Sequence, residues 1–323
     1  MNRFFRRYPE LGFRLFTGAF ALAVVLLVAG IGVELWRQSV LAIQKFGLHF
    51  WLTDTWDPVA GEFGARPFIW GTLYSSVLAL LIAGPVALGI AIFISELCPA
   101  RLRPVLQQVT ELLAAIPSIV YGLWGIFVLV PAVRAVQTHL PDAVRALPFF
   151  SGPPLGVGMG AAVLILAVMV IPYTSSVARE VLKAVPMAQR EAAYALGATR
   201  WEAIRVAVQY ARVGIIGSIM LGFGRALGET MAVTMVIGNS PQVALSLFAP
   251  QYTMAAVIAN EFTEAADELY LNALVEVGLL LFIITLLVNA ASRLLIWRTT
   301  RDSAGASWWR RAIRRPVAAA GPA

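Results

Sequence analysis

The feature that most constrains this chain is a series of apolar runs, each long enough to cross a lipid bilayer. A helix of about 20 apolar residues spans the hydrocarbon core of a membrane and satisfies its own backbone groups there. The runs cover about 15–35, 70–95, 106–131, 158–179, 213–237 and 271–297. With 59% hydrophobic and 13% charged residues, the chain lacks the polar surface of a soluble domain. The sequence predicts an all-α, polytopic membrane protein with six transmembrane helices.

The first apolar run follows a short basic segment. Residues 1–14 contain four arginines, and the run at 15–35 lacks a clean small-x-small cleavage site. We therefore predict an uncleaved first span, with a removed signal peptide as the alternative. Residues 36–68 are polar and aromatic, contain several turn-forming residues, and are expected to form an external connection.

Lysine and arginine are distributed unevenly between the two sides of the predicted helices. Nineteen lie in the N-terminus, the 96–105 and 179–212 loops and the C-terminal end, five lie in the alternate loops, and Arg225 lies inside a span. Because cytoplasmic loops are rich in these residues, both termini and the 179–212 loop are predicted to be cytoplasmic. The net charge of +7 then reflects topology rather than nucleic-acid binding. The basic tail at 310–315 is expected to lie against anionic lipid headgroups.

The 179–212 loop carries a pattern of short helices. Pro186 suits the first turn of a helix and Gly197 suits the residue just past its end, while Thr199 and Glu202 have the spacing of a capping box. These signals predict a helix, a tight bend and a second helix. We expect these two helices to form an angled, projecting segment that another protein can bind. The alternative is a turn lying on the membrane surface.

The same loop carries a family resemblance. Its segment Glu191-Ala192-Ala193, followed by Gly197-Ala198, resembles the EAA loop of ABC-importer permeases, which docks into the ATP-hydrolysing subunit. Two flanking stretches are similar to the PstC-type permeases of phosphate importers, namely AIPSIVYG at 115–122 and LGFGRALGETMAV at 221–233. The resemblance covers about 60–297 and departs from the family at 209–210, where Gln-Tyr stands in place of Leu-Pro.

The resemblance implies a MetI-like permease architecture in three parts. Residues 1–68 would form the N-terminal cytoplasmic segment, the first transmembrane anchor and an external loop. Residues 69–297 would form the permease domain with cytoplasmic coupling helices at about 186–210, and 298–323 a basic cytoplasmic tail. Within the coupling helices, the residues expected to contact the ATPase are Glu191, Ala192, Ala193 and Gly197.

The resemblance also implies a location, a cargo and partners. The location is the bacterial inner membrane and the cargo is inorganic phosphate. The expected partners are a second permease subunit of the PstA type, a PstB-type ATPase dimer, a PstS-type external phosphate-binding protein and the lipid bilayer, without nucleic acid. The acidic stretch at 239–270, which has no lysine or arginine, favours handover of an anion by such a partner.

Two charged residues stand out in the fifth predicted span. Arg225 and Glu229 are one helical turn apart and able to face each other, although a charge at a helix centre costs about 2.5–3.5 kcal/mol. They could form an ion pair that fixes helix register. Alternatively, the planar N–H donors of the Arg225 guanidinium could bind phosphate oxygens, as the resemblance implies. Glu229 would then neutralise the charge of Arg225 when no phosphate is bound. Glu111 and Glu276 are further candidates for pairing with Arg225.

Hydroxyl-bearing residues complete the candidate path. Ser118 and Tyr121 follow Pro117, and Thr174 follows Pro172, so these hydroxyls could line a polar route or bond back to their own helices. A stripe of small residues in the fifth span lets another helix approach closely. The stripe consists of Gly214, Ser218, Gly222 and Ala226.

The chain has no sequence of the form Gly-x-x-x-x-Gly-Lys-Ser/Thr to hold ATP phosphates. We therefore expect no cofactor on this chain, no catalytic residues of its own, and ATP-Mg on a separate ATPase. Its two histidines, His49 and His139, lack partners at ligand spacing, so no metal site is predicted. The alternatives are a permease for another oxyanion, such as molybdate or sulfate, and a stand-alone secondary transporter.

Overall fold

The computed structural model describes residues 4–305, which are mostly helical. Six of their helical segments are long and apolar enough to cross a membrane, so the predicted fold class and number of spans are confirmed. These segments are Gly12–Gln38, Arg66–Leu97, Ser118–His139, Met159–Lys183, Arg200–Leu227 and Glu268–Arg298. The predicted lipid-facing tail at 310–315 lies outside the described residues.

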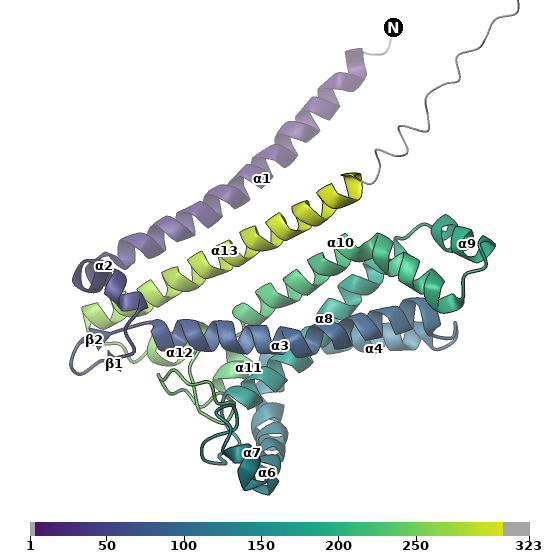
Figure 1. Ribbon diagram of the computed structural model, residues 1–323. Coiled ribbons are helices and arrows are strands. Elements are labelled where there is room, and N and C mark those ends of the chain that lie inside the picture. The colour runs from purple at the N-terminus through teal and green to yellow at the C-terminus, as the bar shows by residue number, and fades with distance from the viewer. Residues whose placement is uncertain (1–3, 306–323) are drawn as a thin grey trace, which may run out of the picture.

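Three helices form the centre of the molecule: α3 (Arg66–Ile92), α8 (Met159–Lys183) and α10 (Arg200–Leu227). They cross the middle of Figure 1 together. In α8, 67% of the most apolar stretch is buried, against 0% in α1 (Phe4–Gln38). The shared interface is rich in alanine, and Gly214 and Gly222 of α10 also lie close to α8. Small residues let membrane helices approach closely enough for van der Waals contact.

Two long helices run beside each other away from this centre. Figure 1 shows α1 and α13 (Glu268–Gly305) extending in the same direction, and the two helices contact each other. At this contact a Cβ added at Gly32 would lie 3.1 Å from the ring of Phe282. The apolar side chains of α1 from residue 12 onward face outward, and Val24, Leu26 and Leu27 are each more than 60% exposed. This surface is suited to lipid or to another membrane protein rather than to water.

Short elements gather at the end of the molecule where α1 stops and α13 starts. They include α2 (Val40–Phe46), a 3₁₀ turn (Gly47–Trp51) and α12 (Met254–Glu261). A small antiparallel hairpin, β1 (Trp56–Asp57) with β2 (Glu62–Phe63), lies beside them. The indole N–H of Trp56 donates to Glu261, 2.8 Å away, and the Tyr270 hydroxyl donates to the same carboxylate at 2.6 Å. These bonds join the hairpin to α12 and α13.

The predicted bounds of the third span, 106–131, are wrong. Instead of one helix over 106–131, the chain forms α4 (Arg103–Ala115), breaks, and starts again as α5 (Ser118–Trp124). The membrane-length segment is completed by a π-helical turn (Gly125–Leu129) and α6 (Val130–His139), before the short α7 (Asp142–Arg145). The break follows from Pro117, which has no N–H and forces the preceding residue into an extended conformation. Pro85 and Pro172, by contrast, lie inside continuous helices.

The fifth predicted span is also displaced. Rather than a short helix after the bend and a span over 213–237, one continuous α10 runs from Arg200 to Leu227. The chain then turns at Gly228 and forms the short α11 (Met231–Thr234). The small-residue stripe of α10 packs on α8 of the same chain, since a Cβ at Gly214 or Gly222 would meet α8 side chains.

Candidate functional site

Arg225 lies in the last turn of α10, close to α8. Its guanidinium carbon is 5.4 Å from the centre of the Tyr173 ring, which is within the range of a cation–π interaction. Its Nε atom is buried and has no hydrogen-bond partner. Among residues 4–305 no carboxylate forms an ion pair with Arg225. The arginine therefore keeps donors available for an anion.

The predicted pairing of Arg225 with Glu229 is wrong. Because α10 ends at Leu227, Glu229 is not on the next turn of the same helix. Its Oε1 atom instead accepts a hydrogen bond from the backbone N–H of Ala232, at 3.3 Å, near the start of α11. Glu229 thus holds the turn between α10 and α11, and the idea that an ion pair fixes the helix register is wrong.

The two alternative partners of Arg225 also lie elsewhere. Glu111 is on α4, which the break at Pro117 separates from α5, and it pairs with Arg179. Glu276 is 2% exposed and lies on α13 beside a cavity of ≈ 200 Å³ that Trp36 and Trp51 help to line. Both pairings with Arg225 are therefore wrong, and the arginine remains without a counter-ion in the described chain.

The three predicted hydroxyl residues lie on α5 and α8, two helices that contact each other. Tyr121 of α5 donates its hydroxyl hydrogen to the carbonyl of Leu113, at 2.8 Å. Thr174 of α8 is 1% exposed and its hydroxyl, which has no partner, faces Gly222 one turn before Arg225. Ser118 starts α5, one turn before Tyr121. Helix α8 thus contacts both α5 and α10, and of the three hydroxyl residues Thr174 is the one that faces α10, next to Gly222.

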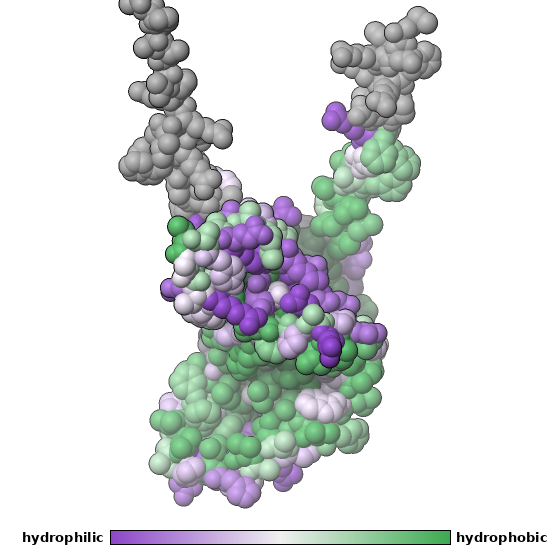
Figure 2. All heavy atoms as spheres, turned by 90° about the vertical axis from the view of Figure 1, so that its right-hand side faces the viewer, coloured by the Kyte–Doolittle hydropathy of each residue, from purple (hydrophilic) through white to green (hydrophobic). Residues whose placement is uncertain are grey.

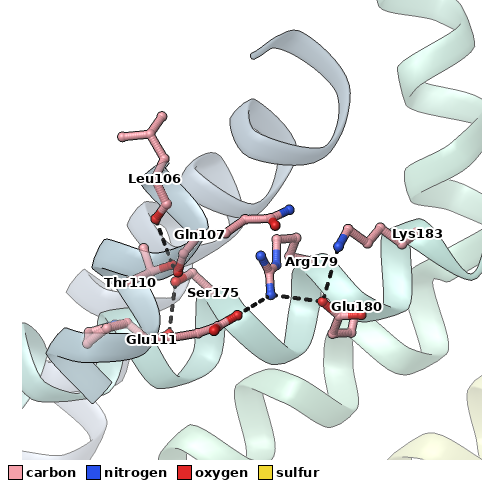
Figure 3. Close-up of polar contacts among 9 residues, drawn as sticks. Leu106, Gln107, Thr110, Glu111, Ser175, Arg179, Glu180 and Lys183 are labelled. Carbon is pink, nitrogen blue, oxygen red and sulfur yellow. Dashed lines mark hydrogen bonds and ion pairs between the residues drawn. The ribbon is translucent and has the colours of Figure 1, made fainter. Parts of the chain in front are cut away.

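Arg179 is a buried cation that sequence reasoning counted only as a topology marker. Figure 3 shows its guanidinium between two carboxylates, Glu111 from α4 at 2.9 Å and Glu180 from α8 at 2.8 Å. Lys183 approaches Glu180 to 3.5 Å. The Arg179 side chain is 5% exposed, whereas both carboxylates are more than half exposed. The cluster joins α4 to α8. Two signals in the sequence point to it: Glu111 lies inside the apolar run at 106–131, and Arg179 ends the run at 158–179.

The bend around Gly197 has the predicted local structure. Helix α9 (Met187–Ala195) starts after Pro186, and Gly197 has φ +82° in a Schellman motif. In that motif the N–H of Ala198 donates to the carbonyl of Ala193, at 3.1 Å. Thr199 and Glu202 then form a capping box at the start of α10. We call residues 186–202 the knob.

The knob projects from the helical body, and most of its side chains are exposed. Figure 2 views the molecule from this side, where hydrophilic residues gather around the knob and hydrophobic ones cover the body below. Of the predicted contact residues, Glu191, Ala192 and Gly197 are exposed and Ala193 is buried. Leu196 and Trp201 are 89% and 64% exposed, so the knob combines polar and apolar surface that a partner could cover.

Comparison with known proteins gives concordant matches. Residues 87–301 match the family described as binding-protein-dependent transport system inner membrane component. The chain is 50% identical over 290 residues to the phosphate transport system permease protein PstC of Haemophilus influenzae, covering 88% of this chain and 92% of that protein. It is 46% identical over 288 residues to PstC of Mesorhizobium japonicum, covering 87% and 88%.

Solved structures share the fold at low sequence identity. An inward-facing MetNI methionine ABC transporter matches with a TM-score of 0.56 at 16% identity, over 76% of this chain and 99% of that chain. A bacterial ABC transporter involved in importing the polysaccharide alginate matches with the same TM-score and identity, over 91% of this chain and 99% of that chain. Transporters of unlike cargoes thus share this arrangement of helices.

Proposed function

Since the chain belongs to the binding-protein-dependent transport system inner membrane components, and within them to the PstC-type permeases, we propose that it is the membrane-spanning subunit of an ATP-binding-cassette importer that carries inorganic phosphate into the cell. The observation that carries this function is the 46–50% identity to PstC proteins along almost nine tenths of the chain. The fold alone does not choose a cargo, because methionine and alginate transporters have it too. The identity therefore favours phosphate over molybdate or sulfate.

The complex we propose places this chain among three kinds of protein partner. A PstA-type permease would complete the membrane domain, a PstB-type ATPase dimer would bind the knob and hold ATP-Mg, and a PstS-type protein would deliver phosphate. The unequal distribution of lysine and arginine supports cytoplasmic termini and a cytoplasmic knob. The chain has no Gly-x-x-x-x-Gly-Lys-Ser/Thr sequence, which supports ATP binding by the partner ATPase alone.

We assign Arg225 to the passage of phosphate. A guanidinium offers a planar fork of donors that matches phosphate oxygens, and the buried Nε has no protein acceptor. Contact with the Tyr173 ring offsets part of the cost of burying the charge without replacing the hydrogen bonds. We assign the hydroxyls of Tyr121, Thr174 and Ser118 to the same path as further polar groups, on α5 and α8. Glu229 acts indirectly, by holding the turn that follows α10.

The assay is uptake of radiolabelled phosphate by the reconstituted complex, normalised to assembled protein. Arg225→Met should leave an assembled complex that hydrolyses ATP but does not accumulate phosphate. Arg225→Lys keeps the charge and loses the fork, so we expect uptake to fall about tenfold or more, roughly 1.4 kcal/mol. Wild-type uptake by Arg225→Met would remove this residue from the path. If the unaltered complex takes up molybdate or sulfate in preference to phosphate, the assignment of phosphate as the cargo is wrong.

A further inference from the structure

Glu96 and Arg190 form a nearly enclosed, two-pronged ion pair between α3 and the knob. Glu96 lies in the π-helical turn (Phe93–Leu97) that ends α3, and Arg190 lies in α9. The Nη2 atom of Arg190 is 2.6 Å from Oε1 of Glu96, and its Nε atom is 3.2 Å from Oε2. The Arg190 side chain is 14% exposed and the Glu96 side chain is 11% exposed. Such paired hydrogen bonds fix direction as well as distance.

The same two residues also hold the helices on either side of the bend. Arg190 donates to the carbonyls of Leu182 and Val185, at 3.1 and 2.9 Å, where α8 ends. Arg200, in the first turn of α10, donates to the backbone carbonyl of Glu96 at 2.8 Å. The end of α8, the knob helix and the start of α10 therefore all meet at the end of α3.

The opposite end of α3 is tied to a different segment, 244–254. The Trp70 indole N–H donates to the carbonyl of Ala244 at 3.0 Å, and the Tyr74 hydroxyl donates to the carbonyl of Leu245 at 2.8 Å. The Thr72 hydroxyl accepts from the N–H of Met254 at 2.9 Å. At 27 residues, α3 is about 40 Å long, so it links two regions on opposite sides of the predicted membrane.

We propose that Glu96 and Arg190 are positioning residues that transmit movement of the knob to α3, and through α3 to segment 244–254. This inference rests on the proposed function, in which an ATPase moves the knob. A two-pronged pair has one preferred geometry, so the end of α3 follows when α9 is displaced. A packed helix moves as a unit, which carries the displacement across the membrane. Without the pair, the ATPase still displaces the knob, but segment 244–254 is displaced less.

The test uses the whole complex in proteoliposomes and measures phosphate imported per ATP hydrolysed. Glu96→Gln loses the charge and Arg190→Lys loses the fork, so each should assemble, hydrolyse ATP within about twofold of the unaltered rate, and import at least about fivefold less phosphate per ATP. Glu96→Arg alone and Arg190→Glu alone should each lower the phosphate imported per ATP hydrolysed. The double variant, in which the two charges are exchanged, should recover part of that loss. A merely structural pair would lower hydrolysis and import together and leave the ratio unchanged.

A matched control is available in the exposed pair Arg66–Asp54. Its N–O distance is also 2.6 Å, but its side chains are 50% and 47% exposed, and exposed pairs contribute little. Asp54→Asn should leave the ratio unchanged. An unchanged ratio in both Glu96→Gln and Arg190→Lys would overturn the inference, as would an equal loss in Asp54→Asn.

A second measurement decides the inference without reference to the cargo. Spin labels at Leu196→Cys in the knob and Leu245→Cys near the far end of α3, with Cys98→Ala, report their separation with and without ATP. We expect the ATP-dependent change in separation to fall by at least about half when Arg190→Lys is added. An equal change with and without Arg190→Lys would overturn the inference. Absence of phosphate import by the unaltered complex would instead overturn the proposed function.

Discussion

Two glycines of α10 provide a matched test of how closely this helix packs on α8. A Cβ added at Gly222 would press on the Thr174 hydroxyl and lie 3.0 Å from a Val170 methyl group. A Cβ added at Gly224, two residues further along the same helix, would meet nothing within 4 Å. Gly222→Ala and Gly224→Ala therefore make the same chemical change in a crowded and an open place.

The expected magnitude follows from two opposing effects. Replacing glycine by alanine inside a helix stabilises it by about 0.5–1 kcal/mol, and this gain applies to both variants. Overpacking a close interface costs about 1–3 kcal/mol, and this cost applies only at Gly222. Gly222→Ala should therefore be less stable than Gly224→Ala by about 1–3 kcal/mol, with Gly224→Ala equal to or more stable than the unaltered protein.

The measurement is the free energy of unfolding of the purified chain in mixed micelles, with each variant unfolded and refolded in the same detergent series. Adding Thr174→Ala to Gly222→Ala removes the hydroxyl that the new methyl group would strike, so the double variant should regain part of the loss. Equal stability of Gly222→Ala and Gly224→Ala would refute the close contact between α10 and α8.

Three shorter predictions concern the polar clusters and the bend. Glu111→Gln and Glu180→Gln should each cost less than about 1 kcal/mol in the same unfolding assay, because the other carboxylate still pairs with Arg179, whereas the double variant should cost about 3–5 kcal/mol. Tyr121→Phe should cost about 0.5–1.5 kcal/mol by removing the bond to the last turn of α4. Gly197→Val, at φ +82°, should weaken ATPase binding in co-purification more than Gly197→Asn does, since asparagine tolerates that conformation.

Local signals explain what could be predicted from the sequence. The number of spans follows from hydropathy, because each run must be a helix to satisfy its backbone in lipid. The bend at Gly197 follows from residues within one turn of it, since Thr199 and Glu202 bond to each other and glycine accepts a positive φ. These features require no knowledge of distant parts of the chain.

The features that escaped prediction depend on where helices end and what they meet. An apolar run gives no sign that Pro117 will separate two helices while Pro85 and Pro172 remain inside theirs, because neighbouring helices decide which break is tolerated. The Glu96–Arg190 pair joins residues 94 positions apart, and each looks like an ordinary surface charge in the sequence. Hydropathy also placed the end of the fifth span too late, which created the apparent pairing of Arg225 with Glu229.

The corrected position of Glu229 strengthens the argument for an anion at Arg225. Had the two residues faced each other in one helix, the charge of Arg225 would have been neutralised locally and a structural role would have explained it. Instead Glu229 bonds to α11, Glu111 bonds to Arg179, and Glu276 lies beside another cavity. A partly buried arginine is expensive in a membrane unless something compensates its charge, and an aromatic ring compensates only part of it. An anionic cargo is the compensation that the proposed function supplies.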